Sequence, residues 1–230
     1  MKQLEINPFE KILIVAPHPD DETIGCGGLM AKYGEQCDIL LITDGRQGYF
    51  EHCTVTDPDE VAKIRKEELL NSAKLLKVHS VICLDLPNEN LKPYISKIKK
   101  YNLKKYNKIF IPGCKEGHRE HVLVNRVLRK MILSQWCKAS VFEYEVWTPM
   151  QNPNYILDIS DYIDKKLEAV SLFKSQIECY DYVNLSKGIN QFRGCTQFVK
   201  YAEMYKKRLM PRDWLRNTYR RIRKIKDVKR

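Results

Sequence analysis

Two short segments of the chain hold most of the side chains that could do chemistry. The first is Ala16–Glu22, with the sequence APHPDDE, and the second is Gly113–His121, with the sequence GCKEGHREH. Together they contain three of the five histidines of the chain, each close to carboxylates. Two imidazoles and one carboxylate form a ligand set of catalytic zinc sites. A further carboxylate beside such an ion can act as a general base.

Each segment follows a run of apolar residues, Ile12–Val15 and Ile109–Ile111. Such runs predict buried strands. Pro17 and Pro19 end the first strand because proline donates no backbone hydrogen bond. The carboxyl ends of parallel strands lie at one edge of a sheet, which is where α/β proteins bind their ligands. We therefore expect the two segments to meet at this edge.

His118 and His121 are spaced i, i+3, so they share one face of a helix that starts here. Brought against His18 and Asp21, the second segment completes a set of two imidazoles and one carboxylate for a metal ion. Asp20 is then left beside the metal as the base. Taken alone, the acidic run has a simpler explanation, since acidic residues at a helix start compensate the helix dipole. The joint pattern at two strand ends favours the metal site.

Strand-like runs alternate with helix-like segments along the chain. The runs that predict strands are Ile12–Ala16, Asp38–Thr43, Ser80–Leu86, Lys108–Pro112 and Ser140–Val146. The segments that predict helices are Glu22–Gly34, Asp59–Lys77, Asn90–Tyr101, His118–Trp136, Ser160–Ile177 and Thr196–Leu209. This alternation predicts a Rossmann-like three-layer α/β/α sandwich with a mostly parallel sheet. We expect Gln47–Pro58 and Cys179–Cys195 to be loops at the rim of a pocket.

The composition suits one substantial domain, since 43% of the 230 residues are hydrophobic. No apolar stretch reaches the ~20 residues that a membrane span needs. The first seven residues contain no signal-peptide core, so we expect a cytoplasmic location. The eight cysteines include no CxxC pair, and several lie in apolar runs. We expect reduced, mostly buried thiols and no thiolate zinc site.

Positive charge is concentrated at the C-terminal end. The formal net charge is +11, yet residues 206–230 alone contain twelve Lys or Arg and two Asp. We therefore predict a catalytic domain over residues 1–205 and a basic amphipathic helix or tail over residues 206–230. Such a helix suits an anionic membrane surface, here the inner face. Docking on the domain or on a second subunit is the alternative, and the absence of a nucleic-acid motif disfavours nucleic acid.

The chain resembles the PIG-L or LmbE-like family of zinc-dependent deacetylases. The most specific similarity is the opening motif Ala16–Glu22, followed by the GCGG sequence of Gly25–Gly28. Further similarities follow in the order of the family pattern: Leu41–Gly45, Arg65 with Glu68, His118–His121, Lys165–Gln176, Arg193–Gly194 and Ala202–Glu203. The resemblance covers about residues 10 to 205. It implies the same Rossmann-like fold.

The resemblance also implies a role for each matching residue in the two segments. His18, Asp21 and His121 match the three zinc ligands of the family. Asp20 matches the general base that activates water. His118 matches the residue that polarises the tetrahedral intermediate and helps to protonate the departing amine. Amide hydrolysis needs these functions in any case, because an oxyanion develops and a nitrogen must leave.

Four more residues are expected around this site because of the resemblance. Arg65, Asp44 and Arg193 are expected to contact the substrate. For Arg65 the alternative is an ion pair with Glu68 or Glu67 on a solvated helix. Glu120 stands where the family usually has an Asp that orients a neighbouring catalytic group. Because Glu is one methylene longer, it places its carboxylate differently.

By resemblance, the protein is a zinc-dependent hydrolase that removes the N-acetyl group of an N-acetylglucosamine-like amino sugar and releases acetate. The sugar could be linked to a nucleotide, a lipid or a metabolite, or belong to a glycan precursor. Fe²⁺ or another divalent ion is the alternative to Zn²⁺. One alternative function is an amidase of a different amide, such as a thiol conjugate. Another is a non-catalytic glycan- or membrane-binding protein, against which the complete set of five site residues argues.

Overall fold

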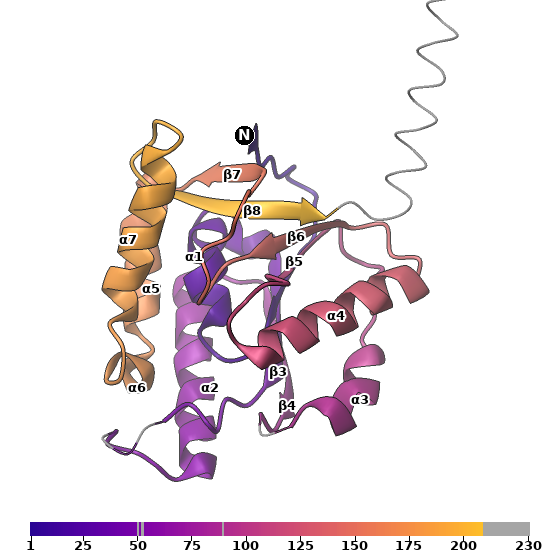
Figure 1. Cartoon of the computed structure of the whole chain (residues 1–230), viewed down its shortest axis with the longest axis vertical. Helices are drawn as coiled ribbons and strands as arrows, with labels where there is room; N and C mark the ends of the chain where they lie inside the picture. Colours follow the sequence, from indigo (N-terminus) through magenta and orange to yellow (C-terminus); the bar gives the residue numbers. More distant parts are fainter. Residues whose placement is uncertain (50, 52, 89, 209–230) are drawn as a thin grey trace, which may run out of the picture.

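The computed structural model describes residues 1–49, 51, 53–88 and 90–208. Within it, the strand β2 (Ile12–Ala16) lies inside the sheet (Figure 1). All five residues of β2 are buried. Successive side chains of a strand point to opposite faces. Ile12 and Ile14 accordingly enter one apolar cluster, and Leu13 and Val15 enter another. A strand buried on both faces must be covered by helices on both sides.

Eight strands form one sheet in the order β1-β7-β8-β6-β5-β2-β3-β4 (Figure 1). Besides β2 they are β1 (Lys2–Gln3), β3 (Cys37–Thr43), β4 (Ser80–Leu86), β5 (Lys108–Pro112), β6 (Ser140–Tyr144), β7 (Tyr155–Asp158) and β8 (Ala202–Arg208). All neighbouring strands pair in parallel except that β8 runs antiparallel to β6 and β7. The chain runs outward from β2 to β3 and β4, then returns to place β5 on the other side of β2. This reversal creates a switch point between β2 and β5, which is where open α/β sheets bind ligands.

Helices cover both faces of the sheet, which makes the predicted three-layer sandwich (Figure 1). Their bounds are α1 (Asp21–Tyr33), α2 (Pro58–Leu75), α3 (Ile95–Lys99), α4 (Arg119–Ser134), α5 (Ile163–Ser171), α6 (Lys174–Ile177) and α7 (Tyr182–Cys195). One apolar cluster joins the sheet to α1, α2 and α5, and the other joins it to α3 and α4. The predicted fold class is thus confirmed. Three of the five strand ranges match the prediction at both ends, and the other two differ by one or two residues.

The predictions for the last part of the chain are wrong. The sequence predicts a helix over residues 196–209, but Ala202–Arg208 form the strand β8. It predicts a loop over residues 179–195, but Tyr182–Cys195 form the helix α7. The helix α7 hides its periodicity because it buries polar Ser186, Asn190 and Arg193. In β8 the buried Glu203 has the same effect. Ser160–Ile177 is likewise broken into a 3-10 turn, α5 and α6, and within Asn90–Tyr101 only a 3-10 turn and the short α3 form.

The cysteine prediction is also corrected. Cys53 and Cys179 form a disulfide, although 126 residues separate them in the sequence. Only Cys26, Cys37 and Cys137 are buried. The bond ties the loop before α2 to the turn between α6 and α7, two segments whose proximity no local pattern reveals. The cysteine content therefore gives no argument for a reducing compartment.

The strand β8 extends to Arg208, so the first three residues of the predicted basic tail belong to the sheet. The rest of that tail lies outside the described residues, and its membrane role stays a prediction. Among residues 1–208, apart from the three positions without a description, no helix is both long and apolar enough to cross a bilayer.

Candidate active site

The carboxyl ends of β2 and β5 bring the two polar segments together. His18, Asp20 and Asp21 lie where β2 passes into α1. His118 lies at the N-cap position of α4, and His121 lies in the first turn of that helix. The ring centroid of His18 is 4.8 Å from that of His118 and 5.2 Å from that of His121. The expected convergence of the two segments is therefore present.

Three donor atoms in this group form a nearly equilateral triangle, which we call the donor triangle. Asp21 Oδ2 lies 3.1 Å from His18 Nδ1 and 3.1 Å from His121 Nε2, and the two nitrogens are 3.3 Å apart. A tetrahedral ion with bonds of about 2.0–2.1 Å holds its ligand atoms about 3.3 Å apart. The donor triangle thus has the size that a small dication needs. More broadly, His18, His118 and His121 offer ring nitrogens within 4.8 Å of one another, a group that could hold a metal ion.

Glu120 fixes the orientation of His18. Its Oε2 lies 2.6 Å from His18 Nε2, on the opposite side of the ring from the donor triangle. A hydrogen bond from Nε2–H to this carboxylate leaves Nδ1 with its lone pair for a metal, as in the carboxylate–histidine pairs of many metal sites. Glu120 therefore contacts the back of a candidate ligand despite its extra methylene.

The charges of the site influence one another strongly. Burial alone would lower the pKa of His18, but the hydrogen bonds to Asp21 and Glu120 outweigh it and raise that pKa to about 9. Burial opposes ionisation of Asp21, yet the neighbouring His121 and His18 hold its pKa well below the usual range. Burial and two nearby imidazoles lower the pKa of His118 to about 4. The buried carboxylate of the donor triangle is thus anionic, the form in which it binds metal.

Asp20 is held in an unusual backbone conformation. Its φ is 122°, a region that L residues rarely adopt and that costs about 1–3 kcal/mol. The backbone N–H donates to Glu22 Oε2 at 3.2 Å, and Glu22 is itself fully buried. Burial raises the pKa of Asp20 to about 7, although the cation of Arg65 acts in the opposite direction. Glu22, to which the sequence assigned no role, thus helps to hold the backbone of the candidate base.

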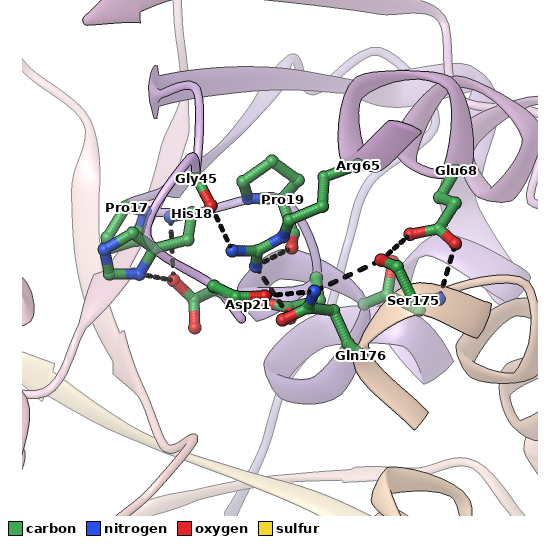
Figure 2. A network of polar contacts seen from close by, with 12 residues as sticks. Pro17, His18, Pro19, Asp21, Gly45, Arg65, Glu68, Ser175 and Gln176 are labelled. Atoms are coloured by element: carbon green, nitrogen blue, oxygen red, sulfur yellow. Dashed lines mark hydrogen bonds and ion pairs between the residues drawn. The ribbon is translucent and has the colours of Figure 1, made fainter. Parts of the chain in front are cut away.

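Arg65 reaches the same turn from α2, but all its hydrogen bonds go to the protein (Figure 2). Its guanidinium donates to the carbonyls of Gly45 at 2.8 Å and Pro19 at 2.6 Å, and to Asp20 Oδ2 at 3.0 Å. Gly45 has a φ of 70°, and a Cβ there would lie 2.7 Å from the guanidinium, so glycine is needed. Arg65 therefore holds Asp20 in position, and it also lines the cavity described below.

The alternative ion pair between Arg65 and Glu68 is absent, since Glu68 accepts hydrogen bonds from the backbone N–H and hydroxyl of Ser175 (Figure 2). Two other predicted substrate contacts also lie elsewhere. Asp44 is buried and pairs with Arg46, and Arg193 is buried and pairs with Glu145. Neither Asp44 nor Arg193 lines the cavity at the metal site.

A cavity of about 750 Å³ opens over the donor triangle. His18, Asp20, Asp21, His118 and Glu120 form part of its wall. The remaining lining residues are Gln47, Gly48, Arg65, Asn88, Gly117, Arg119, Trp147, Gln176, Tyr180 and Tyr182. The two predicted rim segments do contribute, through Gln47, Gly48, Tyr180 and Tyr182. Asn88 and Trp147 carry no motif, and only the folded chain reveals that they face the site.

Comparison with known proteins identifies the family. The family model described as GlcNAc-PI de-N-acetylase, PIG-L, matches residues 13–132. A diacetylchitobiose deacetylase from Thermococcus kodakarensis is 31% identical over 202 aligned positions, which cover 74% of this chain and 71% of that protein. The chain belongs to the PIG-L family. The matched region contains both polar segments and thus the whole donor triangle.

Solved structures show how widely the fold of this PIG-L protein occurs. An inhibitor complex of N,N′-diacetylchitobiose deacetylase from Pyrococcus horikoshii has a TM-score of 0.74 at 24% identity, covering 86% of this chain and 84% of that one. A 4-carboxy-2-hydroxymuconate hydratase from Pseudomonas putida also reaches 0.74, at 18% identity, covering 88% and 97%. Since a deacetylase and a hydratase share this fold, the fold alone does not identify the reaction.

Proposed function

We propose that the protein is a metal-dependent deacetylase that hydrolyses the acetamide of an N-acetylglucosamine-type amino sugar. Membership of the PIG-L family and the 31% identical diacetylchitobiose deacetylase support amide hydrolysis on an amino sugar. The observation that carries the proposal is the donor triangle with Asp20 beside it. The 750 Å³ cavity above it lies within the size range of small-molecule sites.

We assign His18, Asp21 and His121 as the metal ligands. Two imidazoles and a carboxylate leave room for water and suit zinc, and the same set suits ferrous iron. When bound, the ion would supply a Lewis acid that acidifies water and polarises the acetamide carbonyl. Zinc is the ion we propose, because two imidazoles and one carboxylate with an open position are a ligand set of catalytic zinc sites.

The residues around the ligands take the remaining roles. Asp20 accepts the proton of the attacking water, and Arg65 and Glu22 hold it in place for this step. His118 lines the cavity, where its N–H can stabilise the oxygen that becomes negative as water attacks the carbonyl. The proton that Asp20 accepted passes to the departing amine by way of His118 as the carbon–nitrogen bond breaks, so that both residues return to their starting protonation states. Acetate and a free amino sugar are the products.

A substrate panel tests the proposal directly. Zinc-loaded protein is incubated with N-acetylglucosamine, its β-1,4-linked dimer and a non-sugar acetamide such as N-acetylcysteine, and both acetate and primary amine are measured. We expect equal amounts of acetate and amine from a sugar and none from the non-sugar amide. The same assays are run on Asp20→Ala, which removes the candidate base and should abolish the release of acetate. Asp164→Asn changes an exposed carboxylate and serves as the matched control. Acetate release from the non-sugar amide alone would overturn the sugar assignment and favour the amidase alternative.

A further inference from the structure

Three aromatic side chains gather on the wall of the cavity. The ring centroid of Trp147 is 5.9 Å from that of Tyr180 and 5.7 Å from that of Tyr182, with nearly perpendicular planes. Tyr180 and Tyr182 are 5.9 Å apart. We call these three residues the aromatic cluster. All three line the same cavity as His18, Asp20 and His118.

The members of the aromatic cluster differ in exposure. Tyr182 is 5% exposed and packs in a small apolar cluster with Ile24 and Val170, so it forms the base. Trp147 is 42% exposed and Tyr180 is 46% exposed, although large aromatic side chains gain stability from burial. Two half-exposed aromatic rings that face a cavity form a surface on which an apolar ligand face can pack.

The turn that carries Trp147 is fixed to the loop that carries His118. The buried carboxylate of Glu116 accepts hydrogen bonds from the backbone N–H groups of Val146 at 2.8 Å, Trp147 at 3.1 Å and Thr148 at 3.1 Å. Glu116 lies two residues before His118. The backbone of Trp147 is therefore held next to the loop that carries His118.

Tyr180 is held from the other side. It follows Cys179, whose disulfide to Cys53 ties the turn between α6 and α7 to the loop before α2. Its backbone N–H also donates to Gln176 O at 3.1 Å. Because both exposed rings are attached to fixed backbone, little conformational entropy is lost when a ligand packs on them.

The rest of the cavity wall indicates what kind of ligand would pack there. Among the described lining residues there is no Leu, Ile, Val, Met or Phe. The side-chain amides of Gln47, Asn88 and Gln176 share the wall with the aromatic cluster. A lipid chain would need an aliphatic wall, whereas a sugar ring has an apolar C–H face for an aromatic ring and hydroxyl groups for amides.

We propose that Trp147 and Tyr180 form a subsite for a second sugar ring, namely the ring joined by a glycosidic bond to the acetamido sugar at the donor triangle. The proposal rests on the proposed deacetylase function, which places the acetamido sugar. The 750 Å³ cavity offers room for both rings. The aromatic cluster then selects disaccharides over free N-acetylglucosamine, and it acts on binding rather than on the chemical step.

Binding without turnover provides the test. We use the zinc-loaded full chain with Asp20→Asn and titrate it by calorimetry with N-acetylglucosamine and with its β-1,4-linked dimer. The dimer should bind about tenfold tighter than the monosaccharide, in line with the strength of aromatic contacts. Adding Trp147→Ala should remove this advantage and leave monosaccharide binding unchanged. Trp147→Phe, which keeps a ring, should retain most of it.

The matched control is Trp136→Ala, because Trp136 is 87% exposed and lies outside the cavity. It should leave both affinities unchanged. The subsite is overturned if Trp147→Ala leaves dimer binding as it was, if it weakens both sugars equally, or if the dimer never binds more tightly than the monosaccharide.

The two proposals fail in different ways. If wild-type protein releases no acetate but its dimer affinity depends on Trp147, the deacetylase proposal falls and the subsite stands. If acetate is released and dimer affinity is independent of Trp147, the subsite falls and the deacetylase stands. As a second measurement, Trp147→Ala should raise KM for the dimer with little change in kcat.

Discussion

At the ends of β2 and β5, the side chains of the donor triangle are nearly fully buried and bonded to one another, whereas two rings of the aromatic cluster are half exposed. The donor triangle comes from two segments that each end a strand, and it is fixed by an eight-stranded sheet. The aromatic cluster comes from a turn after β6, from the turn between α6 and α7, and from the first residue of α7. Loops on a rigid scaffold can vary while the scaffold keeps its chemistry.

The two regions should therefore respond differently to substitution. Changes in the donor triangle should affect metal binding and the rate for every substrate. Changes in the aromatic cluster should affect the choice of substrate and leave the metal in place. The following predictions test this difference, beginning with the largest effect on activity.

The largest effect is expected for His121→Ala. His121 is fully buried and contributes one corner of the donor triangle, so its loss removes a ligand and leaves Asp21 without one of its partners. We expect zinc content close to zero and acetate release at the background level. Zinc content is measured by elemental analysis of dialysed protein. Full zinc content in this variant would exclude His121 as a ligand.

Arg65→Lys is expected to have the next largest effect. Lysine cannot reproduce the fixed fork of donors with which Arg65 binds two carbonyls and Asp20. We expect kcat to fall by about 10–100-fold, the scale of a small misplacement of a catalytic group, with KM nearly constant. Steady-state kinetics separate the two parameters. A large rise in KM with kcat unchanged would instead favour the substrate contact expected from the sequence.

Glu120→Ala tests the support behind the donor triangle. Without the carboxylate, the ring of His18 loses the partner that orients it. Loss of such a contact typically costs about 10–100-fold in metal affinity or activity. Competition with a fluorescent zinc chelator measures the affinity. Glu120→Asp, which restores the residue usual in the family, should lose less than Glu120→Ala, and an equal loss in both would contradict an orienting role.

The smallest effect on activity is expected from loss of the disulfide between Cys53 and Cys179, near the rim of the cavity. Titration of the unfolded, unreduced protein with a thiol reagent should find six free thiols among the eight cysteines. Cys179→Ser should lower the free energy of unfolding by roughly 2–5 kcal/mol. The same variant should bind the β-1,4-linked N-acetylglucosamine dimer severalfold more weakly and keep its zinc content unchanged. Eight free thiols would contradict the disulfide.

The sequence predicts the donor triangle and its position well, because the relevant residues immediately follow apolar strand runs. The strands Ile12–Ala16 and Lys108–Pro112 follow from local patterns, and a parallel sheet brings their ends together. The later helix α7 and strand β8 do not follow, because α7 buries mostly polar residues and β8 buries the charged Glu203 among its apolar residues. Glu203, for example, is buried because Lys166 lies 2.7 Å away and the N–H groups of Gly28 and Leu29 donate to it.

The same reasoning explains which site residues the sequence could not assign. A motif shows that Arg65 is near the site but not that its donors point to Pro19 and Asp20. Trp147 and Asn88 belong to no pattern, since their place at the cavity depends on loops far apart in the chain. The disulfide between Cys53 and Cys179 could not be predicted for the same reason, because it joins two segments far apart in the chain.

The central claim is that adjacent aspartates have separate roles, with Asp21 holding the metal and Asp20 acting as the base. The most direct test compares Asp20→Asn with Asp21→Asn in zinc content and acetate release, on the same preparations. We predict that Asp20→Asn keeps zinc and loses about 10²–10⁴-fold in kcat, whereas Asp21→Asn loses both zinc and activity. Equal zinc loss in the two variants, or full activity of zinc-loaded Asp20→Asn, would contradict the account.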